Sequence, residues 1–331
     1  MGKVLVTGAN GFLGSWLVRK LLNDGHDVSI LARKNSDLSE LKNLEFKICY
    51  GDVTDLDSLN SATSGVEKVY HLAGLIAYTP EARSQMNKVN IDGTKNVISA
   101  FQKNNCSELL YLSSVVAIGA GFTPSDILNE DSPYNIHHLN LGYFETKHAA
   151  EKIVIDACKK NQIKAFIVNP STIYGRGDAK KGSRKTQIKV ARGEMPFYTR
   201  GGVNVVAVED VIEGIFLAMK NGKSGERYIL SGNNMTIKEL FSHIADEAGV
   251  QPPKIEMPSA LLHGIGRVGD LCSKIGLKSL SSISSENAAT ATMYHWFDSS
   301  KAKNELGFKA SDSRVAIKNS VMWMKENGLL K

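Results

Sequence analysis

One glycine-rich segment near the N-terminus constrains the fold more than any other part of the chain. The apolar run Val4–Thr7 leads into glycines at positions 8, 11 and 14, and a helical pattern follows over Phe12–Asn23. Glycines at this spacing permit a tight turn, close approach of a pyrophosphate, and close packing of helix on strand. A purely structural turn is the alternative, but this context predicts a nucleotide site. The residues expected to contact a dinucleotide here are Thr7, Gly8, Asn10, Gly11, Phe12, Leu13 and Gly14.

Short apolar runs alternate with longer helical patterns through the first half of the chain. This alternation indicates crossover connections between parallel strands, with helices covering both faces of the sheet. We therefore predict an α/β fold whose doubly wound Rossmann domain spans residues 1–172. Residues 173–331 are expected to form a smaller, mixed α/β substrate-binding lobe, and the segment 201–231 is expected to return to the first domain.

The composition is that of an ordinary globular protein. The chain has 331 residues and a formal net charge of +6, and this length suits roughly two domains of ~150 residues each. Its four cysteines are widely scattered and its eight histidines show no metal-ligand spacing, so neither a disulfide framework nor a metal site is expected. Reduced thiols are typical of a reducing compartment, which predicts a cytoplasmic protein.

No membrane span and no nucleic-acid partner are expected. The chain starts directly with a strand-like run, without the pattern of a secretory leader. The longest uncharged stretch, residues 109–125, contains serines, glycines and a proline, which suit a strand and a loop better than a membrane helix. The positive charge is spread along the chain. Its densest run, residues 180–189, is predicted to be a solvated loop and helix start, with a site for an anionic substrate as the alternative.

The end of the second strand bears on the choice of dinucleotide. An acidic residue there would bind the ribose hydroxyls of NAD, but this strand ends in Arg33 and Lys34. An arginine can hold a 2′-phosphate by two charge-assisted bonds, and the lysine adds charge. This favours NADP, although Arg33 could instead stack on adenine and allow NAD. The ends of the next two strands supply further expected contacts at Asp52, Val53, Leu72, Ala73 and Gly74.

Tyr143 and Lys147 are four residues apart on a predicted helix and so share one face. A free tyrosine has a pKa near 10, and a neighbouring ammonium lowers it by favouring the phenolate. Ser114 follows the fifth strand, at the edge where open α/β sheets bind ligands. Alone, the pair could be a surface pair and the serine a turn residue. Together with the glycine turn, in this chain order, they predict an acid/base site.

The motifs together resemble an extended short-chain dehydrogenase/reductase, in the dihydroflavonol 4-reductase-like branch of the NAD-dependent epimerase/dehydratase family. The resemblance covers nearly the whole chain. The segments that carry it include VTGANGFLG (6–14), GDVTD (51–55), HLAG (71–74), VNIDGTKNV (89–97), LSSVVAIG (112–119), YFETK (143–147) and NPSTIYGRGD (169–178).

The resemblance implies a role for each matching residue. Tyr143 would be the acid/base, Lys147 would bind the nicotinamide ribose and tune Tyr143, and Ser114 would orient the substrate oxygen. Asn90 would support a proton-relay water. The backbone around three further residues would hold the nicotinamide carboxamide: Pro170, Ser171 and Ile173.

The activity expected from this resemblance is NADP(H)-dependent reduction of a ketone or aldehyde, or oxidation of a secondary alcohol. The alternative enzyme is a sugar or nucleotide-sugar epimerase or dehydratase with tightly bound NAD. Asn169 weakens that reading, because many nucleotide-sugar members carry arginine there. A scaffold that only binds the cofactor is a third hypothesis. A homodimer through helices 83–103 and 142–160 is also implied. The residues expected to contact a small-molecule substrate are Tyr78, Ser114 and Arg176.

Overall fold

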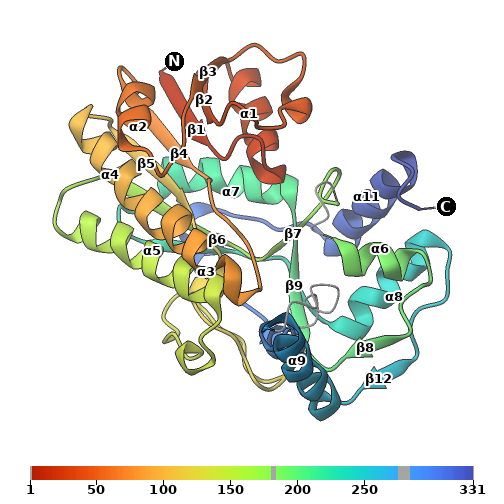
Figure 1. The fold of residues 1–331 in the computed structure, drawn as a ribbon. Helices are drawn as coiled ribbons and strands as arrows, with labels where there is room; N and C mark the ends of the chain where they lie inside the picture. The colour runs from red at the N-terminus through yellow and green to blue at the C-terminus, as the bar shows by residue number, and fades with distance from the viewer. Residues whose placement is uncertain (1, 180–183, 275–283, 331) are drawn as a thin grey trace.

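A seven-stranded parallel sheet forms the centre of the larger part of the molecule (Figure 1). The computed structural model describes residues 2–179, 184–274 and 284–330. The strand order is β10-β6-β5-β4-β1-β2-β3. The order reverses between β1 and β4, and ligands bind at such a reversal in open α/β sheets. The strands are β1 (Lys3–Thr7), β2 (Asp27–Ala32), β3 (Lys47–Tyr50), β4 (Lys68–His71), β5 (Glu108–Leu112), β6 (Ala165–Pro170) and β10 (Arg227–Leu230).

Helices cover both faces of this sheet, so the predicted Rossmann fold is confirmed. Val4 and Val6 of β1 belong to the core beneath helices α1 and α7, whereas Leu5 belongs to the core beneath α2, α4 and α5. This alternation follows from the two-residue period of a strand, and burial on both faces explains why the strands are continuously apolar. The covering helices are α1 (Phe12–Asn23), α2 (Leu56–Thr63), α4 (Gly93–Lys103), α5 (Gly142–Lys159) and α7 (Val208–Asn221).

The helix predicted over residues 83–103 is interrupted by a wider turn. It consists of α3 (Arg83–Met86), a π-helical segment η3 (Asn87–Asp92) and α4 in direct succession. Such π-helical turns are rare and occur often at functional sites. Asn90 lies within this turn and is buried. Apolar spacing alone could not predict the turn, because the helical pattern continues through it.

A smaller lobe is built around a second, four-stranded sheet. Helices α6, α8 and α11 pack with this sheet around a separate apolar core. The sheet contains β7 (Thr172–Tyr174), β9 (Gly202–Ala207), β11 (Asn233–Thr236) and β13 (Tyr294–His295), while β8 (Phe197–Thr199) pairs with β12 (Ile255–Met257). The helices of this half are α6 (Lys185–Ala191), α8 (Ile237–Ala248), α9 (Ser259–Lys274), α10 (Ser285–Thr292) and α11 (Ser313–Glu326).

The chain passes back and forth between the two lobes after the predicted domain boundary. Within the segment 201–231, which was expected to return to the first domain, β9 joins the small sheet instead. Helix α7 then covers the large sheet, and β10 completes its edge. The boundary between residues 172 and 173 stays a prediction. The capping box predicted from Thr236 and Glu239 is present at the start of α8, and it satisfies backbone N–H groups that a helix start leaves unpaired.

None of the described helices is long and apolar enough to cross a bilayer. The uncharged stretch 109–125 instead contains most of β5 and a short 3-10 turn, Val115–Ala117. Within the described ranges, no three potential metal ligands cluster together. Lys180 and Lys181 of the basic run lie outside the described residues. Arg184, from the same run, pairs with the buried Asp178, its Nε 3.3 Å from Oδ2.

Candidate functional site

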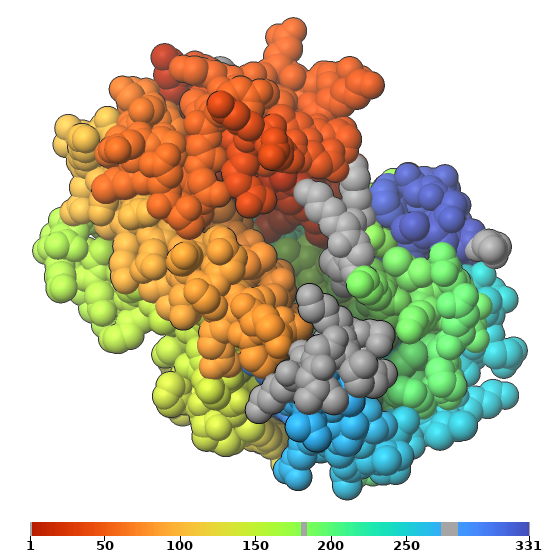
Figure 2. All heavy atoms as spheres, in the orientation of Figure 1, coloured from red at the N-terminus to blue at the C-terminus, as the bar shows by residue number. Residues whose placement is uncertain are grey.

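A cavity of about 370 Å³ lies at the carboxyl edge of the large sheet. Figure 2 shows this face of the molecule, with the segments of the large sheet beside those of the small lobe. Ten of the residues predicted to bind a dinucleotide line the cavity: Thr7, Gly8, Asn10, Gly11, Arg33, Asp52, Val53, Leu72, Ala73 and Gly74. The lining residues that the motifs did not predict are Leu31, Ala32, Ser36, Gly51, Leu75, Gln85 and Val89.

The glycine turn forms a cradle with no room for side chains. Gly8 has a φ of +72°, in the left-handed region, and a Cβ there would lie 2.6 Å from the backbone nitrogen of Ala73. A Cβ at Gly14 would collide with the carbonyl of Gly8. Gly11 is the residue just before α1, and no side chain caps the helix. The exposed backbone N–H groups of a helix start bind anions well. The turn therefore fits the pyrophosphate of a dinucleotide.

Of the two basic residues after β2, Arg33 lines the cavity and Lys34 does not. Arg33 lies at the rim of the cavity with 72 % of its side chain exposed, and its Nε is 4.0 Å from Oδ2 of Asp52. An exposed pair at this distance is weak, so the guanidinium can turn toward a bound anion. Lys34 is exposed and does not line the cavity.

A buried histidine ties the ends of β1 and β4 together beneath the cavity. The ring of His71 lies 2.8 Å from the hydroxyl of Thr7 through Nδ1 and 3.2 Å from the hydroxyl of Thr94 through Nε2. The Thr7 hydroxyl accepts from the Ala73 N–H, and the Thr94 hydroxyl donates to the Asn90 carbonyl. One neutral tautomer, protonated at Nε2, satisfies every bond in this chain. Burial lowers the pKa of His71 to about 3, which keeps the ring neutral.

Ser114 and Tyr143 come together at the carboxyl edge of the sheet. Tyr143 lies in the first turn of α5 and is buried. Burial raises its pKa, while a hydrogen bond with Ser114 acts in the opposite direction. The net shift is therefore upward, not downward as expected from a neighbouring ammonium. The physical reason is that the cost of placing a negative charge in this apolar position dominates, so Tyr143 is a neutral phenol at neutral pH.

Lys147 is buried one turn further along α5. Its Nζ donates to the carbonyl of Leu112 at 2.8 Å and to the hydroxyl of Tyr111 at 3.2 Å. The same Nζ lies 4.7 Å from the centre of the Tyr111 ring. Burial lowers the pKa of Lys147 to about 8, and the charge of Glu151 opposes that shift. The ammonium is thus held against the end of β5, one helical turn from Tyr143.

The side-chain amide of Asn90 makes three hydrogen bonds to other residues of the protein. Its Oδ1 accepts from the N–H of Leu75 at 2.7 Å, and its Nδ2 donates to the carbonyl of Leu75 and the hydroxyl of Thr146, both at 3.0 Å. Thr146 in turn donates to the carbonyl of Tyr143 at 2.9 Å. Asn90 therefore joins the loop after β4 to the first turn of α5, and its role beside a relay water stays a prediction.

Apolar side chains pack around Tyr143. The Tyr78 ring lies edge-on to the Tyr143 ring, with the ring centres 6.2 Å apart. Met86, Leu141 and Met293 belong to the same buried cluster. Among the residues predicted to meet a substrate, Tyr78 and Ser114 are therefore both close to Tyr143.

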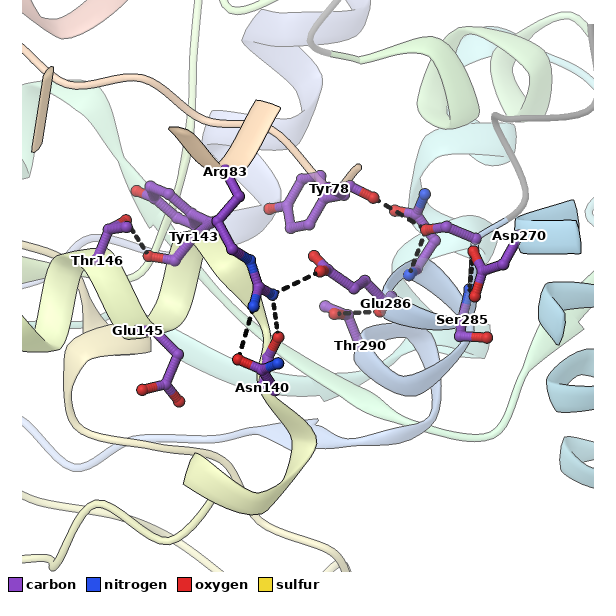
Figure 3. Close-up of polar contacts among 12 residues, drawn as sticks. Tyr78, Arg83, Asn140, Tyr143, Glu145, Thr146, Asp270, Ser285, Glu286 and Thr290 are labelled. Carbon is purple, nitrogen blue, oxygen red and sulfur yellow. Dashed lines mark hydrogen bonds and ion pairs between the residues drawn. The ribbon is translucent and has the colours of Figure 1, made fainter. Parts of the chain in front are cut away.

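The two lobes meet beside this cluster (Figure 3). Arg83 of α3 pairs with Glu286 of α10 at 3.1 Å, and it donates to Oδ1 of Asn140, just before α5, at 2.7 Å. The hydroxyl of Ser284 donates to the carbonyl of Tyr78 at 2.9 Å. These contacts hold the small lobe against the loop before α5, and no motif signalled them because their members are far apart in sequence.

The remaining predicted residues lie in other surroundings. Arg176 was expected to contact a substrate, and this stays a prediction. Its guanidinium pairs with Glu326 at the surface, with 44 % of its side chain exposed. Pro170 ends β6. Ser171 donates to Oδ1 of Asn204 at 2.6 Å, and the carbonyl of Ile173 accepts from Arg184. The residues predicted for the dinucleotide that do not line the cavity are Phe12, Leu13, Gly14, Lys34, Tyr143, Lys147, Pro170, Ser171 and Ile173.

Comparisons with known proteins agree with this geometry. The family model described as the NAD dependent epimerase/dehydratase family matches residues 4–231. A Synechocystis protein named "Putative dihydroflavonol 4-reductase" is 31 % identical over 98 % of this chain and 95 % of its own length. A Methylococcus capsulatus protein named "Sterol demethylase protein B" is 29 % identical, over 98 % of this chain and 99 % of its own. The crystal structure of gox2253 superposes with a TM-score of 0.88 at 33 % identity and covers 100 % of both chains.

The chain belongs to the NAD dependent epimerase/dehydratase family of extended short-chain dehydrogenases/reductases, in the branch similar to dihydroflavonol 4-reductase. It is accordingly an NAD(P)-dependent oxidoreductase. The cavity and the glycine cradle lie at the carboxyl edge of the large sheet, and Ser114 and Tyr143 meet at that same edge.

Acidification is expected to destabilise the fold through His71. Its pKa is about 3 when folded and near 6.5 when unfolded. The unfolded chain therefore takes up the proton first. The contribution to stability is complete above about pH 6.5 and declines as the pH falls toward 3. Urea unfolding of His71→Gln between pH 4 and 7 should show a shallower decline than the wild type. The exposed His137 gives the control, His137→Gln, and an unchanged slope in His71→Gln would contradict the account.

Proposed function

We propose that the protein is an NADP(H)-dependent reductase of a ketone or aldehyde, which also runs in reverse as a secondary-alcohol dehydrogenase. The observation that carries this proposal is the buried phenol of Tyr143 in contact with Ser114, at the same sheet edge as the glycine cradle. A phenol that burial keeps protonated is suited to donate a proton to a carbonyl oxygen. The dinucleotide, when bound, supplies or accepts the hydride.

The chain's own residues position and protonate the substrate. The hydroxyls of Ser114 and Tyr143 hold the reacting oxygen. In reduction, the Tyr143 hydroxyl gives its proton to that oxygen as the carbonyl becomes an alcohol, and in oxidation it takes the proton back. Lys147, held against β5, supplies positive charge close to the phenolate that forms. Asn90 and Thr146 fix the turn that carries Tyr143. Fixing these groups in place removes much of the entropy cost of the reaction.

The surroundings of Tyr143 favour an apolar substrate. Tyr78, Met86 and Met293 form one buried cluster with it. Arg184 is the described cation whose charge opposes the upward shift in the pKa of Tyr78. It already pairs with Asp178 and stacks on Tyr174, with its guanidinium carbon 4.0 Å from the ring centre. A relative of nearly the same length is named for sterol demethylation. We therefore propose a ring-containing ketone or secondary alcohol of low polarity.

A sugar or nucleotide-sugar epimerase remains the alternative, because the family model is named for epimerases and dehydratases. The two reactions differ in cofactor balance. A reductase consumes NADPH in step with the substrate, so absorbance at the reduced nicotinamide falls steadily. An epimerase isomerises its substrate with no net change in the cofactor. The cytoplasmic location and the homodimer through helices 83–103 and 142–160 are further parts of this proposal.

Replacing Tyr143 with phenylalanine should abolish turnover without preventing cofactor binding. Removal of a general acid typically costs roughly 10²–10⁴-fold in rate. We expect kcat for NADPH-dependent ketone reduction to fall by that amount in Tyr143→Phe, with the Kd for NADPH changed less than about threefold. Tyr50, with 58 % of its side chain exposed, provides the matched control, Tyr50→Phe. Activity within about twofold of wild type in Tyr143→Phe would refute the assigned role.

Arg33 is expected to set the preference for NADP over NAD. A hydrogen bond to a charged group contributes about 1.5–3 kcal/mol, or roughly 10–100-fold in binding. In Arg33→Gln, the KM for NADPH should rise by that factor, while the KM for NADH changes little. Lys34→Gln, outside the cavity, should have a smaller effect. Equal changes in both KM values would instead assign Arg33 to stacking on adenine.

A further inference from the structure

A buried network of polar side chains lies behind Ser114 and Lys147. Its centre is Glu151 on α5, which is 1 % exposed. Glu151 Oε2 accepts from the Nδ2 of Asn169 at 2.5 Å, and Oε1 pairs with Nη1 of Arg227 at 3.0 Å. A carboxylate so deeply buried is costly unless it is paired and hydrogen-bonded. Both oxygens of Glu151 have such a partner, and one of these partners is the guanidinium of Arg227.

Asn169 connects Glu151 to the end of β5. Its Nδ2 donates a second bond to the carbonyl of Ser114 at 3.0 Å. Asn169 is fully buried, and its Oδ1 has no hydrogen-bond partner within the described part of the chain. The orientation of the amide is therefore fixed by its two acceptors, Glu151 and Ser114. The position of the Ser114 backbone depends on a carboxylate that lies on the catalytic helix.

The same carboxylate is one helical turn beyond Lys147, on the same face of α5. Four titratable or charged groups, from the strands and the helix packed here, lie around Lys147 or around Glu151. His71 of β4 is neutral, and Tyr111 of β5 accepts a hydrogen bond from Nζ. Tyr143 of α5 is a neutral phenol, and Arg227 of β10 shares the charge of Glu151. Among the described residues, Glu151 is the one carboxylate whose charge raises the pKa of Lys147.

We propose that Glu151 is a positioning residue for the catalytic pair: through Asn169 it holds the backbone of Ser114, and from one turn away it provides the negative charge that retains the Lys147 ammonium. This rests on the proposed function, because it assigns Ser114 and Lys147 to the reaction. Glu151 itself touches neither the substrate nor the cofactor. Arg227 pairs with the same carboxylate. Loss of Glu151 and loss of Arg227 should therefore have different effects on the pKa of Lys147.

The test compares two variants that each remove one charge, Glu151→Gln and Arg227→Gln, by NMR titration of protein labelled with ¹³C at the lysine ε-carbons. Lys147→Arg assigns the resonance. The wild-type pKa of Lys147 is about 8. Loss of a neighbouring charge typically moves a pKa by about one unit or more. We expect Glu151→Gln to lower the midpoint and Arg227→Gln to leave it unchanged or raise it. In turnover, the basic limb of the kcat/KM profile should move in the same directions.

If Glu151 and Arg227 only held the fold together, the loss of either one would move the Lys147 midpoint in the same way. Equal shifts in the two variants, or no shift in Glu151→Gln, would therefore overturn the proposal. If Glu151→Gln alone does not fold, the double variant Glu151→Gln/Arg227→Gln leaves no unpaired buried charge, and it must lower the midpoint too. Asp156→Asn, on the exposed side of α5 where Asp156 pairs with Lys152, is the control and should change nothing.

The link to Ser114 is tested separately by Asn169→Leu, which removes the amide but keeps the charges of Glu151 and Arg227. We expect kcat to fall at least about tenfold while the Lys147 midpoint stays within about half a unit of wild type. Unchanged kcat would overturn this arm of the proposal. The lysine titration needs no turnover. It therefore still reports on Glu151 if the protein proves to have another activity, and the two failures are distinguishable.

Discussion

The close backbone packing at the reversal of strand order determines the rest of the site. Gly8 lies so near the backbone of Ala73, and Gly14 so near the carbonyl of Gly8, that no side chain fits at either position. This packing holds the turn before α1 against the residues that follow β4, at the reversal of strand order. A helix start without a side-chain cap at that point leaves backbone donors for an anion.

Helix α5 is fixed to the same edge by polar contacts from several elements. Asn90 and Thr146 hold the turn that carries Tyr143, and Lys147 is bonded to the end of β5. On the other side, Arg83 joins the start of α5 to Glu286 of the small lobe. Tyr143, the proposed acid/base residue, is thus held from both lobes. Its protonation follows from burial, so the packing that positions Tyr143 also keeps its proton in place.

The features that the sequence could predict have strong local signals. The glycine turn, the continuous apolar strands and helix α5 all depend on residues close together in the chain. Features that depend on distant partners were missed or wrong. The wider turn at Asn90, the pairing of Arg176 with Glu326, and the upward pKa shift of Tyr143 each require knowledge of what packs nearby. The short strands β8, β12 and β13 contain too few residues for an alternating pattern to be visible.

A crystal structure of the protein grown with NADP⁺ tests the central claim most directly. The account predicts that the pyrophosphate contacts the backbone between Gly8 and Gly11, that the 2′-phosphate lies beside Arg33, and that the nicotinamide ring lies next to the hydroxyl of Tyr143. A dinucleotide bound elsewhere on the molecule, or a ring distant from Tyr143, would contradict the account.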